Sequence, residues 1–345
     1  MIVSAEALRR FTTAVFLGAG MTDAHAATLA DALVWANLRG VDSHGVVRIA
    51  RYVELIEIGD INPRPVMTTR TETAAALLLE ADRAAGPIAM TAAMTAAMAK
   101  ARAVGVGLSL VRGTTHTAAL GYYTLMAATD GMAGLAVSAS TPMMAYHGAR
   151  AAGVSTNPIS IAVPGGHGPM VLDMATGVVS MGRLLEARRA GRPIPPDWAL
   201  DGDGNPTTDP RKARIPRPLG GPKGAGLSLM IECLTSLVVS NVILADALEA
   251  TPGERHHKQN ALALAINLAR FGDPQAFRRE VDRLIAALKA LPRDPAVAEI
   301  LMPGERGQRT FEQRRRDGVP LPPAIVEDLG RLATRLGVTM FAPGI

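Results

Sequence analysis

The hydrophobic pattern of this chain changes near residue 73, and that change constrains the fold more than any other feature. Before it, apolar residues recur with the period of amphipathic helices. After it, short runs of β-branched and aliphatic residues, bounded by Gly and Pro, alternate with helical stretches. Strands separated by helices are typical of α/β proteins, in which helices cover a parallel or mixed sheet. We therefore expect an α/β fold with a helical N-terminal region and a mixed sheet in the middle of the chain.

Start and stop signals divide the N-terminal region into three expected helices, because Ser, Thr and Asp cap helix N-termini and Gly ends helices. The first two helices stop at Gly18 and Gly40, and the third stops at Gly59. In chain order the three cover residues 5–17, 23–39 and 44–58, and their caps are Ser4, Thr22 or Asp23, and Asp42 or Ser43.

The later elements follow from the same patterns. Residues 191–224 are dense in Pro, Gly and Asp and are predicted to form a long ordered loop, and loops of that length usually serve a site. Residues 225–245 are predicted to form a buried helix and not a membrane span, because Glu232 and Asn241 interrupt the apolar run. The expected strands are 75–80, 107–111, 135–138, 159–163 and 170–173, and the other expected helices are 90–103, 118–129, 260–271, 273–291 and 324–336.

Composition narrows the possible functions. Aromatic residues make up only 3% of the chain, so platforms for stacking bases have little material. The net charge is +5, but the basic residues are scattered, and we expect no nucleic-acid partner. The single cysteine, Cys233, cannot form an intramolecular disulfide and is predicted to be a core side chain. The first six residues lack the basic and apolar regions of a secretion signal, so we expect a cytoplasmic protein without a membrane anchor.

Several common motifs are missing. The chain has neither G-x-G-x-x-G nor G-x-x-x-x-G-K-[ST], so the usual dinucleotide fold and the usual nucleotide-triphosphate loop are not predicted. It also lacks G-x-S-x-G and H-E-x-x-H. The seven histidines do not pair with carboxylates at helical metal-binding spacing. We therefore expect neither a serine hydrolase nor a metal site.

The densest group of chemically useful side chains lies between Arg39 and Arg48. In the expected helix, His44 occupies the first turn and Arg48 follows on the same face, so both would point into one cavity. A helix N-terminus disfavours imidazolium, so His44 would be neutral and able to accept a proton. The guanidinium of Arg48 suits a carboxylate, and Ser43 would orient the ring or a substrate oxygen. A base beside an anion clamp indicates chemistry next to a carboxylate; the alternative is a capped helix with surface hydrogen bonds.

Further clusters could hold an anion. Residues 113–121 follow a strand and open a helix, so their hydroxyls and backbone amides form either a pyrophosphate cradle or an ordinary turn. Lys223 lies between glycines after the long loop, where it could contact phosphate, ribose or a carboxylate, or form a Schiff base. Residues 155–158 and 172–176 place small polar groups at strand ends, where sites often collect.

Together these stretches resemble one family. The segments that carry the resemblance follow the family's order along the whole chain: RGVDSHGVVRIARYVE, THTAALGYY, STNPISIAVP, LDMATG, IPPDWALDGDGNPTTDP, PLGGPKGAGLSLMIE and MPGE. They are similar to the malate/L-lactate dehydrogenase family, whose fold is distinct from that of the ordinary lactate dehydrogenases. The resemblance implies a hydride-transfer enzyme using NAD or NADP. It also implies a homodimer and a largely antiparallel sheet that is not a Rossmann fold with a glycine fingerprint.

The resemblance also implies roles for individual residues. His44 would be the acid/base, tuned by Ser43, while Arg48 and Thr156 would hold the carboxylate of a small 2-hydroxy or 2-oxo acid. His116 competes with His44, because some members are described with a histidine at that position as the proton acceptor. The dinucleotide would be lined by four segments: His116, Thr117, Ala118, Ala119 and Leu120; Asp173, Met174 and Ala175; Lys223 and Gly224; and Pro303, Gly304, Glu305 and Arg306.

Departures from the family leave the substrate and the nicotinamide open. Thr117-Ala118 stands where many members have an aromatic residue and Gly, and Ser155 stands where they have Gly. The arginines Arg183, Arg188 and Arg189 would either favour the 2′-phosphate of NADP or form a solvated helix face.

The resemblance implies two domains and leaves rival functions. Residues 1–72 with about 275–345 would form a helical substrate and dimerisation domain, and residues 73–274 would bind the nicotinamide dinucleotide. The nearest alternative is an NADPH-dependent reductase of a cyclic ketimine carboxylate of the Δ1-piperideine-2-carboxylate type. The remoter alternatives are a pyridoxal-phosphate (PLP) enzyme using Lys223 and a non-enzymatic anion-binding protein.

Overall fold

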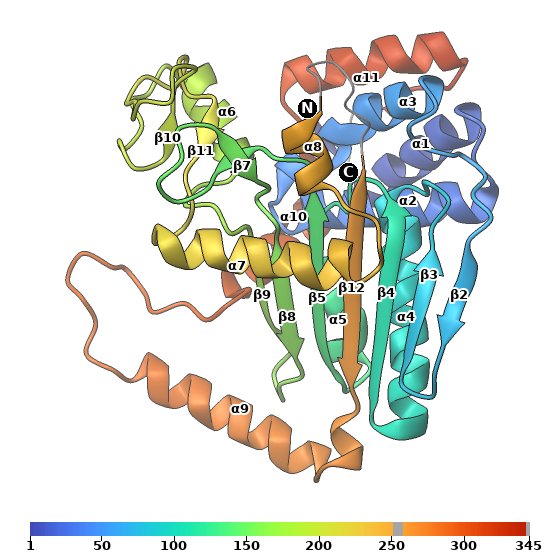
Figure 1. Cartoon of the computed structure of the whole chain (residues 1–345), viewed down its shortest axis with the longest axis vertical. Helices are drawn as coiled ribbons and strands as arrows, with labels where there is room; N and C mark the ends of the chain where they lie inside the picture. The colour runs from blue at the N-terminus through green and yellow to red at the C-terminus, as the bar shows by residue number, and fades with distance from the viewer. Residues whose placement is uncertain (251–257, 343–345) are drawn as a thin grey trace.

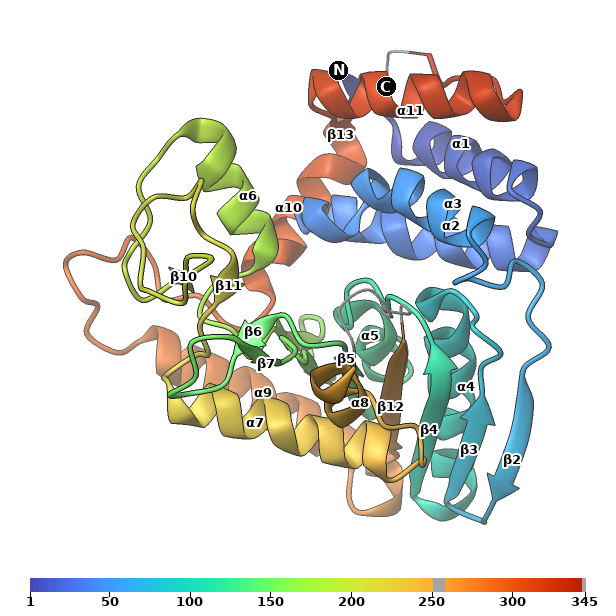
Figure 2. The same cartoon turned by 45° about the horizontal axis from the view of Figure 1, so that its top comes forward.

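The computed structural model describes residues 1–250 and 258–342. The molecule has two layers (Figures 1 and 2). Helices from both ends of the chain form one layer, and a seven-stranded sheet with helices on both faces forms the other. The predicted mixed α/β fold is confirmed.

The helical layer joins the two ends of the chain. Its elements are β1 (Ile2–Val3), α1 (Ala5–Gly18), α2 (Asp23–Leu38), α3 (Ile49–Glu57), α10 (Glu305–Asp317), β13 (Val319–Pro320) and α11 (Pro323–Leu336). β1 pairs antiparallel with β13, and α11 packs against α1 and α3. The predicted caps Ser4 and Thr22 are confirmed, because their side chains accept hydrogen bonds from backbone amides in the first turns of α1 and α2.

The sheet is mixed, with a single parallel pair. Its strands are, in spatial order, β2 (Thr68–Glu72), β3 (Ala76–Glu80), β4 (Val106–Thr114), β12 (Gln259–Ile266), β5 (Ala133–Ser140), β8 (Ile159–Val163) and β9 (Met170–Met174). Only β3 and β4 run parallel, and every other neighbouring pair is antiparallel. The expectation of a largely antiparallel sheet is confirmed. The five predicted strands coincide with β3, β4, β5, β8 and β9 or with parts of them, except that residue 75 lies just before β3, whereas β2 and β12 were not predicted.

The prediction of a helix at 260–271 is wrong, because residues 259–266 form β12 in the centre of the sheet. Between Ala261 and Ile266, alanine alternates with a larger residue. The alanines are fully buried on one face of the sheet, and the larger side chains lie on the other face. Alanine is a strong helix former, but pairing with β4 and β5 along the whole strand outweighs that preference.

Helices cover the two faces of the sheet. α4 (Gly86–Val104) packs against β4 and β12, and α5 (Gly121–Thr129) packs against β5 and β8. α7 (Pro222–Glu232) crosses the opposite face in front of the strands (Figure 1). A Cβ on Gly107 would lie 1.8 Å from the carbonyl oxygen of Ala97, so α4 can approach β4 this closely only where the strand has no side chain.

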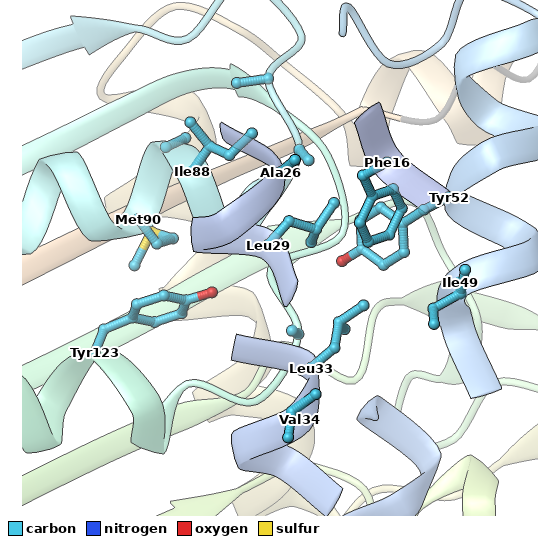
Figure 3. Close-up of a cluster of buried hydrophobic side chains, with 14 of the residues drawn as sticks. Phe16, Ala26, Leu29, Leu33, Val34, Ile49, Tyr52, Ile88, Met90 and Tyr123 are labelled. Carbon is cyan, nitrogen blue, oxygen red and sulfur yellow. The ribbon is translucent and has the colours of Figure 1, made fainter. Parts of the chain in front are cut away.

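The two layers share one hydrophobic core. Leu29 of α2, Phe16 of α1 and Tyr52 of α3 are almost completely buried. Figure 3 shows Leu29 between this aromatic pair and the side chains of Ile88 and Met90 of α4. The helical layer is therefore packed directly onto the helices that cover the sheet.

Residues 178–217 leave the sheet and form a small unit of their own, beside the two layers (Figure 2). It contains α6 (Met181–Ala190) and the short pair of β10 (Ala199–Leu200) and β11 (Ile215–Pro216) around a separate cluster of buried apolar side chains. Another short pair, β6 (Met144–Ala145) and β7 (Ala152–Val154), precedes β8. Most of the segment predicted as a long loop is irregular, and it ends where α7 begins.

The prediction of a buried helix at 225–245 is wrong. α7 ends at Glu232, continues as a π-helical stretch over Cys233–Leu237, and is followed by α8 (Leu244–Glu249). The outer face is apolar and exposed, and its residues are Leu227, Met230, Leu234, Leu237 and Val238, here called the α7 stripe. Cys233 is half-buried and not a core residue. In the part of the chain that the structure describes, no helix is long and apolar enough to cross a membrane.

α9 (Pro274–Lys289) confirms the helix predicted at 273–291, but it has few contacts. Val281 is its one buried residue, although the helix is 16 residues long. Figure 1 shows α9 at the end of the sheet remote from the helical layer.

Candidate active site

Residues 42–48 form an irregular connection between α2 and α3, and the helix expected to start near Ser43 is absent. Two 3-10 turns, Asp42–His44 and Val46–Arg48, are separated by Gly45, and α3 begins only at Ile49. The predicted group of side chains is nevertheless brought together. The Oγ of Ser43 lies 3.0 Å from Nδ1 of His44, and Nε of Arg48 donates a hydrogen bond of 2.7 Å to the carbonyl oxygen of Ser43.

Asn37 of α2 explains why this connection is not helical. Its buried Oδ1 accepts the amide hydrogen of Val46 at 2.8 Å, and its Nδ2 donates to Asp42 at 2.6 Å. A Cβ on Gly45 would lie 2.1 Å from this Oδ1, so the close approach requires glycine. Arg314 of α10 pairs with Asp42 at 2.7 Å. A residue near the C-terminus therefore holds the turn that carries His44.

The structure brings the two candidate acid/base residues together. The imidazole rings of His44 and His116 are stacked, with centroids 5.5 Å apart and an interplanar angle of 17°. The hydroxyl of Tyr52 lies 2.9 Å from Nδ1 of His116 and 2.8 Å from the carbonyl oxygen of the same residue. His116 follows β4, so this contact joins the helical layer to the sheet.

Burial sets the charge of this group. It lowers the pKa of His44 to about 4, and the positive charge of Arg48 acts in the same direction. The imidazole is therefore neutral near pH 7, as expected, although the cause is not a helix terminus. Arg48 is half-buried, and within residues 1–250 and 258–342 no carboxylate lies within 4 Å of its guanidinium. Burial of this cation lowers its pKa, and an anion from outside the chain would compensate for the lost hydration.

A second group lies at the end of β9. One carboxylate oxygen of Asp173 accepts the amide hydrogen of Gly121 at 2.7 Å. The residue is accessible to solvent, yet neighbouring atoms crowd its carboxyl group, and this desolvation raises its pKa to about 6 against the opposing effects of Gly121 and Arg39. The helix expected at 118–129 begins only at Gly121, and the amide of this first residue donates to the carboxylate of Asp173. An ionised carboxylate would repel a pyrophosphate, so this helix end favours the ordinary turn over the phosphate cradle.

The four segments that were expected to line the dinucleotide meet around β9. Gly121 ties the end of the His116 segment to Asp173. A Cβ on Gly224 would lie 2.6 Å from the carbonyl oxygen of Thr176, just beyond β9. A Cβ on Gly304 would lie 2.8 Å from the carbonyl oxygen of Val171 within β9. Three of the segments therefore converge on β9 and the residues just after it, which supply the fourth, and two of the three do so through glycines that allow close backbone approach.

Comparison with known proteins shows the family of the chain. The family model described as malate/L-lactate dehydrogenase matches residues 3–330. The chain belongs to this family. Malate dehydrogenase of Pyrococcus horikoshii is 34% identical over 346 residues, which cover 97% of this chain and 96% of that protein.

Two further relatives show the range of the malate/L-lactate dehydrogenase family. L-sulfolactate dehydrogenase of Methanocaldococcus jannaschii is 35% identical over 343 residues, which cover 99% of this chain and 98% of that protein. The solved structure of the sulfolactate dehydrogenase from this organism has a TM-score of 0.89 at 33% identity and covers 99% of this chain and 98% of its own. Delta(1)-pyrroline-2-carboxylate reductase of Ancylobacter novellus is 28% identical over 325 residues, or 92% of this chain and 94% of that protein. These relatives are named dehydrogenases or reductases, and the chain is an NAD(P)-dependent oxidoreductase.

Other positions expected from the malate/L-lactate dehydrogenase family lie at the same end of the sheet but do not all face the histidines. The carbonyl oxygen of Thr156 accepts from the amide of Thr176, and its hydroxyl contacts the sulfur of Met143. None of these bonds reaches Arg48. Lys223 is exposed in the first turn of α7 and so lacks the desolvation that activates a Schiff-base lysine.

The segment Pro303 to Arg306 has its own internal bonds. Hydrogen bonds from Lys289 and from the amide of Met302 lower the pKa of Glu305 to about 2, so its carboxylate holds the start of α10. Arg306 is exposed. Of the arginines considered for the 2′-phosphate, Arg188 donates to two backbone carbonyls in the 178–217 unit and is structural.

In the segment 116–120, the residues after His116 are fixed by contacts, backbone conformation or burial. The hydroxyl of Thr117 lies 3.1 Å from that of Ser138, and Ala118 has a positive φ of 53°. A left-handed conformation costs a residue with a Cβ about 1 kcal/mol or more, and glycine avoids that cost. The Ala119 and Leu120 side chains are buried, whereas Met174 and Ala175 are half-buried.

Three residues of the site were not predicted from the sequence. Tyr52 was a visible candidate, because it follows Arg48 by four residues, but nothing local indicated that it reaches His116. Asn37 gave no signal, since its partners depend on the fold of the next turn. Gly182 of α6 was also missed. A Cβ there would lie 2.7 Å from Cβ of Ser43, so the 178–217 unit packs directly on the turn that carries His44.

The described part of the chain contains no group of three or more His, Cys, Asp or Glu residues placed to hold a metal ion.

Proposed function

We propose that this oxidoreductase transfers a hydride between NAD(P) and the carbon next to the carboxylate of a small 2-hydroxy or 2-oxo acid. The observation that supports this most is the half-buried guanidinium of Arg48, which has no carboxylate partner in the described residues and lies beside a neutral imidazole. A substrate carboxylate would supply the missing negative charge. Malate and L-sulfolactate, named for two of the relatives, are both 2-hydroxy acids.

His44 is proposed to move the proton. In oxidation the neutral imidazole takes the proton of the substrate hydroxyl, and in reduction the imidazolium returns it. The charge of Arg48 depresses the pKa of His44, and a carboxylate bound to Arg48 would offset that charge. Substrate binding would thus raise the pKa of His44 toward a value that suits proton transfer near neutral pH. Ser43, 3.0 Å from Nδ1, orients the ring.

The second histidine is proposed to complete the site. The ring of His116 stacks on that of His44, with the two centroids 5.5 Å apart. We assign the principal acid/base role to His44, because Arg48 belongs to the same turn.

The bound nicotinamide would accept or donate the hydride. The segments proposed to hold the dinucleotide are 116–120, 173–175, 223–224 and 303–306. They fit an extended ligand, because Gly304 brings distant backbone against β9, and Gly224 brings distant backbone against Thr176 just beyond that strand, without intervening side chains. We propose residues 73–274 as the dinucleotide-binding domain, and residues 1–72 with about 275–345 as the domain that supplies His44 and Arg48.

A second candidate is reduction of a cyclic ketimine carboxylate. The relative named Delta(1)-pyrroline-2-carboxylate reductase favours it. Such a substrate has a carboxylate for Arg48 and a nitrogen that takes a proton as the neighbouring carbon receives hydride, so the same residues would serve.

A substrate panel tests both candidates. Purified protein is first titrated with NADH and NADPH, and binding is followed by nicotinamide fluorescence. It is then supplied with 2-oxo acids or cyclic ketimine carboxylates, and oxidation of the reduced cofactor is followed by absorbance. We expect turnover with a 2-oxo acid such as oxaloacetate or sulfopyruvate. Turnover of ketimines alone would favour the second candidate, and nicotinamide binding without any turnover of a carboxylate substrate would contradict both.

We further propose a homodimer that covers the apolar surface of the sheet domain. The α7 stripe exposes between 38% and 55% of each side chain. Beside it, Leu135, Ile161 and Leu172 lie in register across β5, β8 and β9, on the face that carries α7, and the last two are more than a third exposed. So much exposed apolar surface on a helix and on the sheet face that carries it is unusual for a monomer. A second copy of this chain would bury it.

A further inference from the structure

The contact between Tyr52 and His116 fixes the position of a proton. Tyr52 is 1% exposed, and its hydroxyl lies within hydrogen-bond distance of two atoms of His116. One of these, the backbone carbonyl oxygen at 2.8 Å, can only accept a hydrogen bond. A phenol has a single proton, so both contacts can be hydrogen bonds only if that proton goes to the carbonyl oxygen.

The contact of 2.9 Å with Nδ1 must then run in the opposite direction. With its proton committed, the phenolic oxygen can only accept, and Nδ1 of His116 has to carry the hydrogen. The burial that raises the pKa of Tyr52 far above its usual value keeps the phenol protonated, so this pattern persists over the whole physiological range.

We propose that Tyr52 is a positioning residue that holds His116 in the tautomer with the proton on Nδ1, so that Nε2 is the only atom of His116 that gains or loses a proton. Both charge states of the ring satisfy the arrangement, because Nδ1 donates to Tyr52 whether or not Nε2 is protonated. The two hydrogen bonds with Tyr52 also fix the plane of the His116 ring, which is stacked on His44. Its role in turnover rests on the function proposed above, whereas the tautomer itself does not.

The tautomer can be measured without substrate or cofactor. Protein labelled with ¹⁵N-histidine is examined by long-range ¹H–¹⁵N correlation at alkaline pH, where the chemical shifts of the two ring nitrogens show which one carries the proton. A His116→Gln variant identifies the His116 signals by their loss. We expect the wild-type protein to have the proton on Nδ1. A proton on Nε2 in the wild-type protein would overturn the proposal, whatever the variants do.

Two tyrosine variants then test the cause. Tyr52→Phe should shift His116 toward the tautomer with the proton on Nε2, which free histidine prefers, and should lower kcat about tenfold, the effect of losing roughly one hydrogen bond. Tyr123→Phe is the matched control, because this buried phenol donates to the backbone carbonyl oxygen of Thr117 at 2.6 Å and contacts no imidazole nitrogen among residues 1–250 and 258–342. It should leave the tautomer unchanged.

The outcomes separate this proposal from the proposed function. An unchanged tautomer in Tyr52→Phe would overturn the role of Tyr52 even if the enzyme turns over 2-oxo acids. A wild-type tautomer on Nδ1 that changes in Tyr52→Phe would support it even if no substrate in the panel reacts. Tyr52→Phe should still bind the nicotinamide with wild-type affinity, and an equal loss of affinity and kcat would indicate general damage and count against a positioning role.

Discussion

Two regions of the molecule break, in opposite ways, the rule that charged side chains are exposed and apolar side chains are buried. One region is the turn at residues 42–48, which carries His44, and the other is the α7 stripe. In the turn, an imidazole and a guanidinium are half-buried, and in the stripe, leucine, methionine and valine side chains are exposed. Asn37, Asp42 and Arg314 satisfy most of the polar groups of the turn, but no carboxylate in the described part of the chain pairs with Arg48. The stripe has no cover in the described residues.

This difference between a buried cation and an exposed apolar surface indicates which kind of partner each region requires. A desolvated cation gains most from an anion, which points to a small charged ligand. An exposed apolar surface gains most from another apolar surface, which points to protein. Variants that change one region should therefore leave the property of the other region unaffected.

The largest effect is expected from His44→Ala. Loss of the proposed acid/base should lower kcat by about 10²- to 10⁴-fold and change nicotinamide affinity little. Steady-state rates and fluorescence titrations measure the two quantities. A variant that keeps more than about a tenth of the wild-type rate would contradict the assignment.

Arg48→Lys should act on the substrate more than on the cofactor. Lysine keeps the charge but loses the planar fork, so KM for the acid substrate should rise about tenfold or more. The affinity for NADH or NADPH should stay the same. An unchanged KM would exclude Arg48 as the carboxylate clamp.

The α7 stripe can be tested by placing charges on it. Met230→Glu combined with Leu234→Glu should weaken the proposed dimer by tenfold or more in Kd, because about 25 cal/mol is lost for each Å² of apolar surface that is no longer buried. Analytical ultracentrifugation over a range of concentrations measures this. Leu17→Glu on α1, which also replaces an exposed apolar side chain, is the control and should leave the assembly unchanged. A wild-type protein that stays monomeric at all concentrations would refute the dimer.

The smallest effect is expected on the pH dependence of stability. Folding lowers the pKa of His44 from 6.5 to about 4, so the unfolded chain takes up a proton below about pH 6.5 and the folded chain does not until about pH 4. The stability that the neutral ring contributes is therefore fully present above pH 6.5 and is lost as the pH falls toward 4. His44→Asn has no such proton to gain.

Denaturant unfolding at about pH 7.5 and about pH 4.5 checks this sign. The wild-type protein should lose more stability between the two conditions than His44→Asn. The raised pKa of Asp173 acts in the opposite direction, but it is present in both proteins and cancels in the difference. Equal losses would show that His44 is not desolvated in the folded protein.

Local signals were sufficient for much of the fold. Ser4 and Thr22 cap the helices that they were expected to cap, because a capping hydroxyl bonds an amide only three residues away. The strands with large aliphatic residues were predicted because short runs of such residues, bounded by Gly and Pro, are also a local signal. β12 was missed, because its alanines favour a helix locally and only the neighbouring strands make it a strand.

The candidate site divides in the same way. Ser43, His44 and Arg48 are close in sequence, and their grouping was predicted, although the helix that was expected to group them does not form. Tyr52 and His116 are 64 residues apart, and no local pattern relates them. The contact exists because the helical layer packs onto the helices of the sheet.

By itself, the sequence determined the helical start of the chain, the aliphatic strands, the motifs shared with the malate/L-lactate dehydrogenase family, and the placing of an imidazole beside a guanidinium. These depend on bonds and periodicities within a few residues. Only the tertiary structure decided the central position of β12, the turn held by Asn37 and Arg314, the stacking of the two imidazoles and the exposure of the α7 stripe. Each of these is set by which distant surfaces meet, and the free energy of such packing belongs to no single segment of the chain.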